Sequence, residues 1–172
     1  HFLMPDCHYM FIAPTGYGKT NLLCNVLLNN WLKYDKAIIY TINPDQDKYK
    51  SLKELSDACE SEVFQILSPD DVIPVEDLDP DEDKVVVFDD IKFDKKNLNN
   101  IKEYYSLSRN KNCNCIYLTQ TYYGVPKDIR RNTGCFILFN GLDNRDIKTI
   151  CSDNCRHINK NEFIHEIEID FL

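Results

Sequence analysis

Long apolar segments are absent from this chain. No apolar run approaches the ~20 residues that a membrane-spanning helix needs, and the N-terminus lacks a basic region followed by an apolar core, so neither a membrane span nor a secretion signal is indicated. Internal repeats and low-complexity linkers are also missing. We therefore expect the 172 residues to form one intracellular domain with a substantial core.

Basic residues are absent from one stretch, residues 70–83. Its eight acidic side chains account for the whole formal net charge of −8. We interpret this stretch as a solvated loop, with shielding of a basic groove as the less favoured alternative. Residues 92–111 carry six basic side chains against two acidic ones. The net acidity therefore does not exclude a polyanionic partner.

The eight cysteines raise the question of disulfides or a metal site. The chain has ample apolar residues for a core, and the phosphate-binding loop described next is typical of a reducing compartment, so we interpret them as thiols. The spacings of Cys113 and Cys115, and of Cys151, Cys155 and His157, resemble zinc sites. Because we expect Cys115 on a strand and Cys151 on a helix, ordinary cysteines are favoured over a metal site.

A short apolar run, residues 9–12, leads into a glycine-containing loop and then into a helix predicted at residues 21–32. The loop matches Gly-x4-Gly-Lys-Ser/Thr except that Ala13 replaces the first glycine. Its backbone N–H groups would form an anion-binding nest at a helix N-terminus. We predict that nucleotide triphosphate binds to Ala13, Pro14, Thr15, Gly16, Tyr17, Gly18, Lys19, Thr20 and Asn21.

The residues of this loop suit different parts of a nucleotide. Gly16 and Gly18 would allow backbone angles and a close approach to oxygen that a side chain would block. Lys19 would reach the β- and γ-phosphates of ATP, and the Thr20 hydroxyl would supply an oxygen ligand to Mg²⁺. The alternative is a chance glycine turn before a helix, and the strand-to-helix position of Gly-Lys-Thr argues against it.

The rest of the chain alternates between predicted strands and predicted helices. Apolar and β-branched runs predict strands at residues 36–42, 62–66, 84–88, 115–119 and 135–139. Helices are predicted at residues 46–58, 97–108 and 125–132. This alternation predicts an α/β fold in which helices cover both faces of a doubly wound, mainly parallel sheet.

Polar side chains follow two of these strands. Asp89 and Asp90 come directly after residues 84–88, and Gln120 ends the strand at residues 115–119. Ligands bind beyond the carboxyl ends of parallel strands, so we expect these side chains beside the phosphate loop. Asp89 suits Mg²⁺ coordination, Asp90 suits deprotonation of the attacking water, and Gln120 suits sensing of the γ-phosphate. A helix cap for the aspartates and a turn residue for Gln120 are the alternatives.

Three sequence blocks, residues 13–20, 85–91 and 116–133, now stand together. The third has a strand that ends in Gln, an aromatic pair, and then Val-Pro-x-x-Ile-Arg-x-Asn. The combination resembles the genome-packaging ATPases of poxviruses, other large DNA viruses, virophages and related transposons, within the FtsK/HerA superfamily of P-loop NTPases. The likeness extends to residues 144–148 and covers about residues 8–152.

The resemblance implies a RecA-like (ASCE) ATPase core that works as a homo-oligomeric ring and threads double-stranded DNA into a capsid. It implies ATP and Mg²⁺ as cofactors, a viral capsid or portal component as a partner, and a place in the host-cell cytoplasmic virus factory or the virion. We expect residues 1–172 to be a single P-loop ATPase domain. An edge strand is predicted at residues 163–172, and we expect the family's C-terminal segment to be truncated there.

Ring motors commonly complete their site with an arginine from the neighbouring subunit. Arg109 matches the family's basic position before the sensor strand and is the predicted catalytic arginine, with Arg130 and Arg131 as alternatives. Contact with DNA is predicted for three lysines that follow the second block: Lys92, Lys95 and Lys96.

Two other functions are open on the sequence. A small-molecule kinase also uses a P-loop, but the two aspartates and Gln120 suit water activation better than a hydroxyl acceptor. A nucleotide-gated interaction module would bind ATP without useful turnover. Steady-state ATP hydrolysis with and without duplex DNA separates the three functions.

Overall fold

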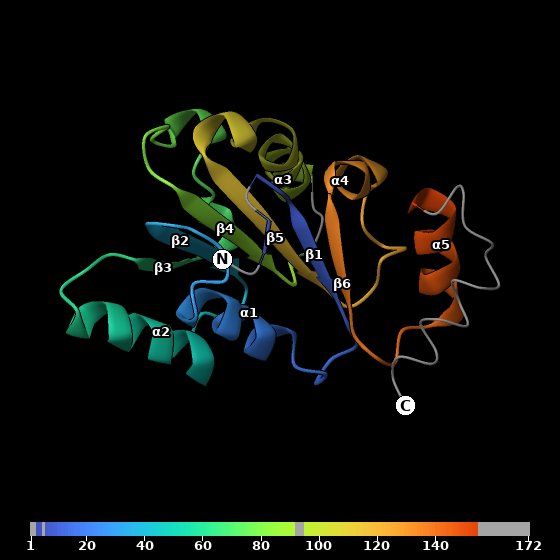
Figure 1. The fold of residues 1–172 in the computed structure, drawn as a ribbon, viewed down its shortest axis with the longest axis horizontal. Coiled ribbons are helices and arrows are strands. Elements are labelled where there is room, and N and C mark those ends of the chain that lie inside the picture. Colours follow the sequence, from blue (N-terminus) through green and yellow to red (C-terminus); the bar gives the residue numbers. More distant parts are fainter. Residues whose placement is uncertain (1–2, 5, 92–94, 155–172) are drawn as a thin grey trace.

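The computed structural model describes residues 3, 4, 6–91 and 95–154, with only the backbone for Lys95 and Lys96. In this part, six strands alternate with helices (Figure 1). The strands are β1 (Tyr9–Ile12), β2 (Lys36–Thr41), β3 (Phe64–Leu67), β4 (Lys84–Asp89), β5 (Cys113–Thr119) and β6 (Cys135–Leu138). The α-helices are α1 (Lys19–Leu28), α2 (Asp47–Ala58), α3 (Lys95–Leu107), α4 (Lys127–Asn132) and α5 (Asn144–Asn154).

The strands form one sheet in the order β3-β2-β4-β5-β1-β6, and every neighbouring pair is parallel. The predicted parallel sheet is therefore confirmed. β5 lies between β1, which precedes the phosphate loop, and β4, which ends at Asp89. Ile12 pairs with Thr119, and Asp89 pairs with Leu118. The ends of these three strands thus meet at one edge of the sheet.

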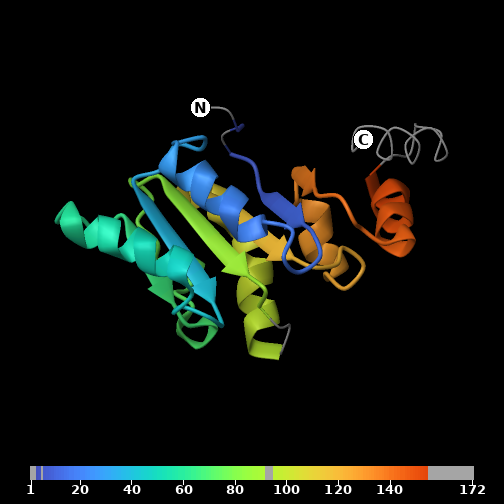
Figure 2. The ribbon, with the colours of Figure 1, turned by 90° about the horizontal axis from the view of Figure 1, so that it is seen from below.

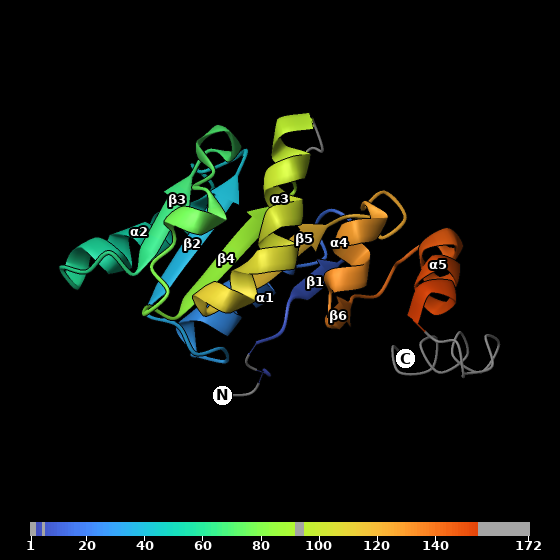
Figure 3. The same cartoon turned by 90° about the horizontal axis from the view of Figure 1, so that it is seen from above.

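Helices cover both faces of the sheet. In β4, Val85 and Val87 share an apolar layer with residues of α1 and α2, whereas Val86 and Phe88 share the opposite layer with residues of α3 and α4. Figure 2 shows α1 and α2 against the first face, and Figure 3 shows α3 and α4 against the second. Burial on both faces explains why β4 is apolar from Val85 to Phe88 without alternation.

The acidic segment, residues 70–83, crosses the second face. Val75 and Leu78 are buried in its apolar layer. The Lys111 ammonium donates to the carbonyls of Glu76 and Leu78, at 3.1 and 3.2 Å. The interpretation as a solvated loop is correct for most of the carboxylates, which are exposed, but it missed these apolar anchors.

Several predicted boundaries are wrong by a few residues. α1 ends at Leu28 rather than at residue 32, because Asn30 adopts a left-handed φ of 51° and the Trp31 N–H donates to the Val26 carbonyl. β5 begins two residues before the predicted start, since Cys113 already pairs with β4. The structure also shows helix α5, for which the sequence predicted only that Cys151 lies on a helix. The strand predicted at residues 163–172 lies outside the described residues.

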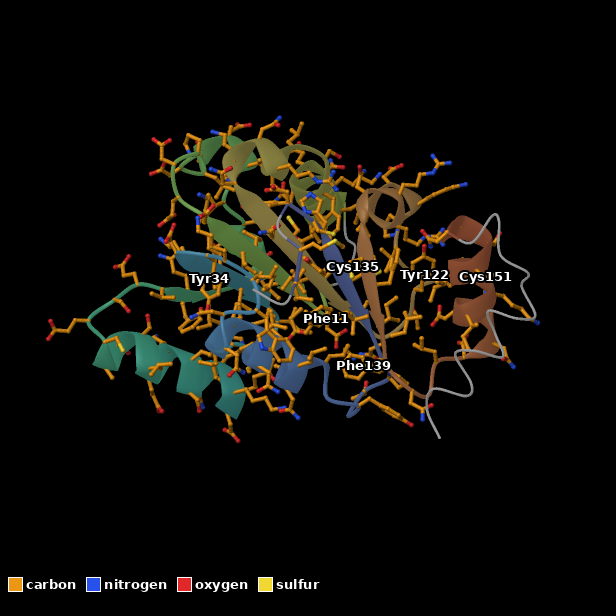
Figure 4. All side chains as sticks on the ribbon, in the orientation of Figure 1. Phe11, Tyr34, Tyr122, Cys135, Phe139 and Cys151 are labelled. Carbon is orange, nitrogen blue, oxygen red and sulfur yellow. The ribbon has the colours of Figure 1, made fainter. Side chains whose placement is uncertain are left out.

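α5 lies beyond β6, away from the centre of the sheet (Figure 1). The Arg130 guanidinium joins it to α4 through an ion pair of 2.6 Å with Asp153, and the Tyr122 hydroxyl hydrogen-bonds the same carboxylate at 3.3 Å. Tyr122 lies between the sheet and α5 (Figure 4). Nearer the site, the Tyr123 N–H donates to the Asp146 carboxylate at 2.7 Å. The segment after Gln120 is therefore bonded to α5 at two points.

Candidate nucleotide-binding site

The loop between β1 and α1 has the backbone that phosphate binding requires. Gly16 and Gly18 adopt positive φ angles of 85° and 95°, in the region where a side chain introduces strain. Gly18 is also the N-cap residue of α1. Ala13 has no positive φ, and its N–H donates to the Thr119 carbonyl of β5 at 3.2 Å. Alanine can therefore replace the first glycine of the consensus.

Lys19 is folded over this loop and is almost fully buried. Its ammonium donates to the carbonyls of Ala13 and Pro14, at 2.7 and 3.3 Å. An ammonium has three N–H donors, so one is left for a ligand. Burial lowers the pKa of Lys19, and the nearby Asp90 and Asp89 carboxylates oppose this shift. The lysine is thus held at the centre of the loop before a ligand arrives.

Asp89, the last residue of β4, is only 7% exposed. Its Oδ2 accepts hydrogen bonds from the Tyr49 hydroxyl at 2.5 Å and from Gln46 Nε2 at 3.5 Å. Burial raises the pKa of the Asp89 carboxyl, while the hydrogen bond from Tyr49 lowers it. Neither donor was predicted from the sequence. The parallel pairing of Thr41 with Asp89 places the residues after β2 beside this carboxylate, so the carboxyl-end rule could have found them.

Asp90 differs from Asp89 in both backbone and environment. It has a positive φ of 49°, which aspartate tolerates better than most residues, and it is half-buried. The left-handed turn lets two consecutive aspartates face different surroundings. The Asp90 Oδ2 accepts a hydrogen bond from Gln120 Nε2 at 3.2 Å. The structure therefore brings the predicted base and the predicted sensor into direct contact.

These groups surround a cavity of about 410 Å³. The P-loop and the start of α1 form one wall, and the β2–α2 loop forms the opposite wall. The lining residues are Thr15, Gly16, Gly18, Lys19, Thr20, Asn21, Thr41, Ile42, Asn43, Gln46, Lys48, Asp89 and Asp90. The residues from Thr41 to Lys48 were not predicted from the sequence. Among the lining residues, Lys19 and Lys48 carry the positive charge.

Three residues of the predicted loop do not line this cavity. Ala13 and Pro14 act instead through the carbonyls that hold Lys19. The Tyr17 side chain is 52% exposed and lies against Gly141, where an added Cβ would come within 2.9 Å of the tyrosine ring. Tyr17 therefore links the phosphate loop to the loop between β6 and α5.

The residues present fit a Mg²⁺ ion that is held together with a nucleotide. Thr20 and Asp89 both line the cavity and offer hard oxygen ligands. In the described ranges, no group of three or more His, Cys, Asp or Glu side chains could hold a metal ion by itself. Mg²⁺ in nucleotide complexes binds through one or two protein oxygens and completes its shell with phosphates and water, so the Thr20 hydroxyl and the Asp89 carboxylate suffice chemically.

The predicted arginine lies outside the cavity. Arg109 is exposed on the 3₁₀ turn η3 (Ser108–Lys111), which precedes β5 at the opposite edge of the sheet. Its Nη2 donates to the Asn132 carbonyl at 3.4 Å. Of the two alternatives, Arg130 is engaged by its ion pair within the subunit, whereas Arg131 is exposed. Arg109 therefore does not line the nucleotide cavity of its own subunit.

The lysines predicted to contact DNA cannot be placed in this site. Lys92 lies outside the described residues, and only the backbone of Lys95 and Lys96 is described, in the first turn of α3. Their role remains a prediction.

Cys115 and Cys151 lie on the kinds of element predicted for them, a strand and a helix. Cys113 and Cys115 lie on β5, and Cys151 lies on α5. The seven cysteines in the described part are free thiols. Cys155 and His157 fall outside the described residues.

No protein-family model and no curated protein sequence matches the chain. Several solved structures, however, are similar to it in fold. The DNA-packaging ATPase B204 from Sulfolobus turreted icosahedral virus superposes with a TM-score of 0.63 at 19% identity, over 88% of this chain and 84% of B204. The genome-packaging NTPase B204 from Sulfolobus turreted icosahedral virus 2, in complex with AMPPCP, gives 0.63 at 19% identity over 88% and 83%.

A further neighbour is the cytoplasmic domain of EssC, with a TM-score of 0.64 at 11% identity, over 90% of this chain and 37% of EssC. The chain has the fold of a P-loop NTPase. Three neighbouring strands of the sheet lead into the site: β4 leads into the two aspartates, β5 leads into Gln120, and β1 leads into the P-loop. No helix in the described ranges is long and apolar enough to cross a membrane.

Proposed function

We propose that this protein is an ATPase that moves double-stranded viral DNA into a capsid. One observation carries the ATPase part of the proposal: Asp90, which accepts a hydrogen bond from Gln120, lines the same cavity as Lys19. A charged phosphate-binding group and a solvent-accessible carboxylate thus converge on one space. This arrangement supports attack of water on a terminal phosphate rather than binding alone.

Each group of the site has a separate role in the proposed hydrolysis. The backbone N–H groups of the P-loop and the Lys19 ammonium hold the β- and γ-phosphates. A Mg²⁺ ion held by Thr20 and Asp89 would neutralise charge on the phosphate oxygens when bound. Asp90 accepts the proton of the attacking water, and Gln120 holds Asp90 and the water in position.

The packaging part of the proposal is supported by two facts. The B204 neighbours are described as DNA- and genome-packaging enzymes, and the three sequence blocks resemble viral packaging ATPases. The position of Arg109, at the sheet edge opposite the cavity, suits a ring in which each subunit completes its neighbour's site. A capsid or portal component is the proposed docking partner.

Long duplex DNA is expected to stimulate ATP hydrolysis by this protein. The stimulation should not depend on DNA sequence and should fall as salt rises, because a motor grips phosphates through charge. Steady-state phosphate release with two unrelated duplexes, at several salt concentrations, measures it. Turnover that requires a hydroxyl-bearing small molecule would instead indicate a kinase, and ATP binding without turnover would indicate an interaction module.

Arg109→Ala is expected to spare the ATP affinity of the isolated subunit and to suppress hydrolysis in the assembled ring. The reason is that the missing guanidinium acts on the neighbour's γ-phosphate. Mixing Arg109→Ala with Asp90→Asn subunits should restore part of the activity at interfaces where an intact Arg109 meets an intact Asp90. Rescue by mixed assembly is the measurement, and the same experiment with Arg131→Ala tests the alternative arginine. Absence of rescue would make Arg109 a solvating residue.

A further inference from the structure

The Asp89 carboxylate is held in place by the start of α2. Gln46 is the N-cap residue of this helix, and Tyr49 follows three positions later. Both side chains donate to the same oxygen, Oδ2. These are the two side-chain donors that the structure gives Asp89 in its described part, so Oδ1 is the oxygen left for the cavity. Two donors on one oxygen fix the rotation of the carboxylate.

Tyr49 is well suited to hold this orientation. Its side chain is completely buried and packs in the same apolar layer as Leu23 and Leu52, so the ring cannot move without disturbing α1 and α2. The hydroxyl is the donor and the Asp89 carboxylate is the acceptor in this contact, because a phenol carries its proton at neutral pH.

The contact also differs from those of two other buried tyrosines on the opposite face of the sheet. The hydroxyls of Tyr104 and Tyr105 donate to backbone carbonyls, of Ile73 and Tyr9, at 2.8 and 2.9 Å. Such bonds satisfy a buried polar group and tie one element to another. The hydroxyl of Tyr49 instead reaches a carboxylate that lines the nucleotide cavity, across 40 residues of sequence.

We propose that Tyr49 is a positioning residue that orients Asp89 toward the metal ion of a bound Mg²⁺–nucleotide complex. This inference rests on the proposed ATPase function. Partners that orient a ligating group matter for metal affinity almost as much as the ligand itself. Because Asn43 and Gln46, which precede Tyr49, line the same cavity, the contact also joins α2 to the nucleotide site. Gln46 assists from the same turn through a longer hydrogen bond.

The test is Tyr49→Phe, which removes one oxygen atom and keeps the ring in the apolar layer. Binding of AMPPCP to the full chain is measured by calorimetry while Mg²⁺ is varied. We expect the Mg²⁺ concentration at half-maximal binding to rise by about tenfold or more. Binding of AMPPCP in EDTA should not change, because the P-loop and Lys19 are intact. A variant with general structural damage would lose binding under both conditions.

Tyr105→Phe is the matched control, since it removes an equally well buried hydroxyl that bonds a backbone carbonyl away from the site. It should keep the wild-type Mg²⁺ midpoint. A wild-type midpoint in Tyr49→Phe, or an equal rise in both variants, overturns the inference. Wild-type protein that fails to bind AMPPCP with Mg²⁺ overturns the proposed ATPase function instead.

A second variant keeps the inference testable if Tyr49→Phe does not fold. Gln46→Met changes a half-buried side chain outside the apolar layer. It should raise the Mg²⁺ midpoint by a smaller factor than Tyr49→Phe, because its hydrogen bond of 3.5 Å is the longer of the two. An unchanged Mg²⁺ midpoint in Gln46→Met contradicts the inference that side chains of α2 orient the Asp89 carboxylate.

Discussion

Replacement of Asp90 by asparagine should leave ATP bound and slow its hydrolysis by at least about a hundredfold, the loss expected for a general base. Asparagine has nearly the same shape, tolerates the left-handed backbone of this position and can still pair with Gln120. It cannot accept the proton of the attacking water. The chemical step should therefore fail while the binding site stays intact.

Single-turnover hydrolysis and equilibrium ATP binding, measured on the same preparation, separate the two effects. Asp81→Asn is the matched control, because it neutralises an exposed carboxylate of the acidic segment. Asp81 lies before the start of β4, whereas the cavity lies at the end of this strand. If binding collapses in Asp90→Asn while bound ATP still turns over at the wild-type rate, the two aspartates have exchanged roles, and Asp89 becomes the predicted base.

Lys19→Ala should weaken ATP binding by at least about tenfold, because the one ammonium donor left for a ligand makes a charge-assisted hydrogen bond to phosphate that contributes ~1.5–3 kcal/mol. The fold should survive. The partners of Lys19 in the free protein are two loop carbonyls, and its side chain belongs to neither apolar layer. Equilibrium binding of ATP and a thermal melt without ligand measure the two quantities independently.

Lys48→Ala provides the comparison for this experiment, since Lys48 also lines the cavity but is exposed and does not contact the P-loop carbonyls. We expect it to weaken binding much less. An ATP affinity that Lys19→Ala leaves unchanged would contradict the P-loop assignment, however well the variant folds.

The sheet and the position of the site were predictable for physical reasons. Strands buried on both faces must be continuously apolar, so the apolar run from Val85 to Phe88 predicted a strand of a parallel sheet that is covered on both faces. The rule that ligands bind beyond the carboxyl ends then placed Asp90 and Gln120 together, 30 residues apart in sequence. Both statements depend on patterns that are local in the chain.

Other parts of the site depend on packing between distant elements. No local pattern distinguishes Tyr49 from the other tyrosines of the chain, because its contact with Asp89 arises only when α2 packs beside β4. The engagement of Arg130 by Asp153 likewise follows from the position of α5. The early end of α1 at Leu28 reflects a left-handed Asn30, a conformation that asparagine permits but does not require.

The strand order also sets when the site can form during synthesis. β1 pairs only with β5 and β6 among the described strands, and its first residue, Tyr9, pairs with Ile116. The strand that carries the P-loop therefore has no partner in the sheet until most of the chain has left the ribosome. β2, β3 and β4 can associate earlier, because they follow one another in sequence and β2 pairs with both β3 and β4. Closing such long loops is slow. The nucleotide site is consequently among the last parts of the sheet to be completed, and ATP can stabilise only chains that have already inserted β1 between β5 and β6.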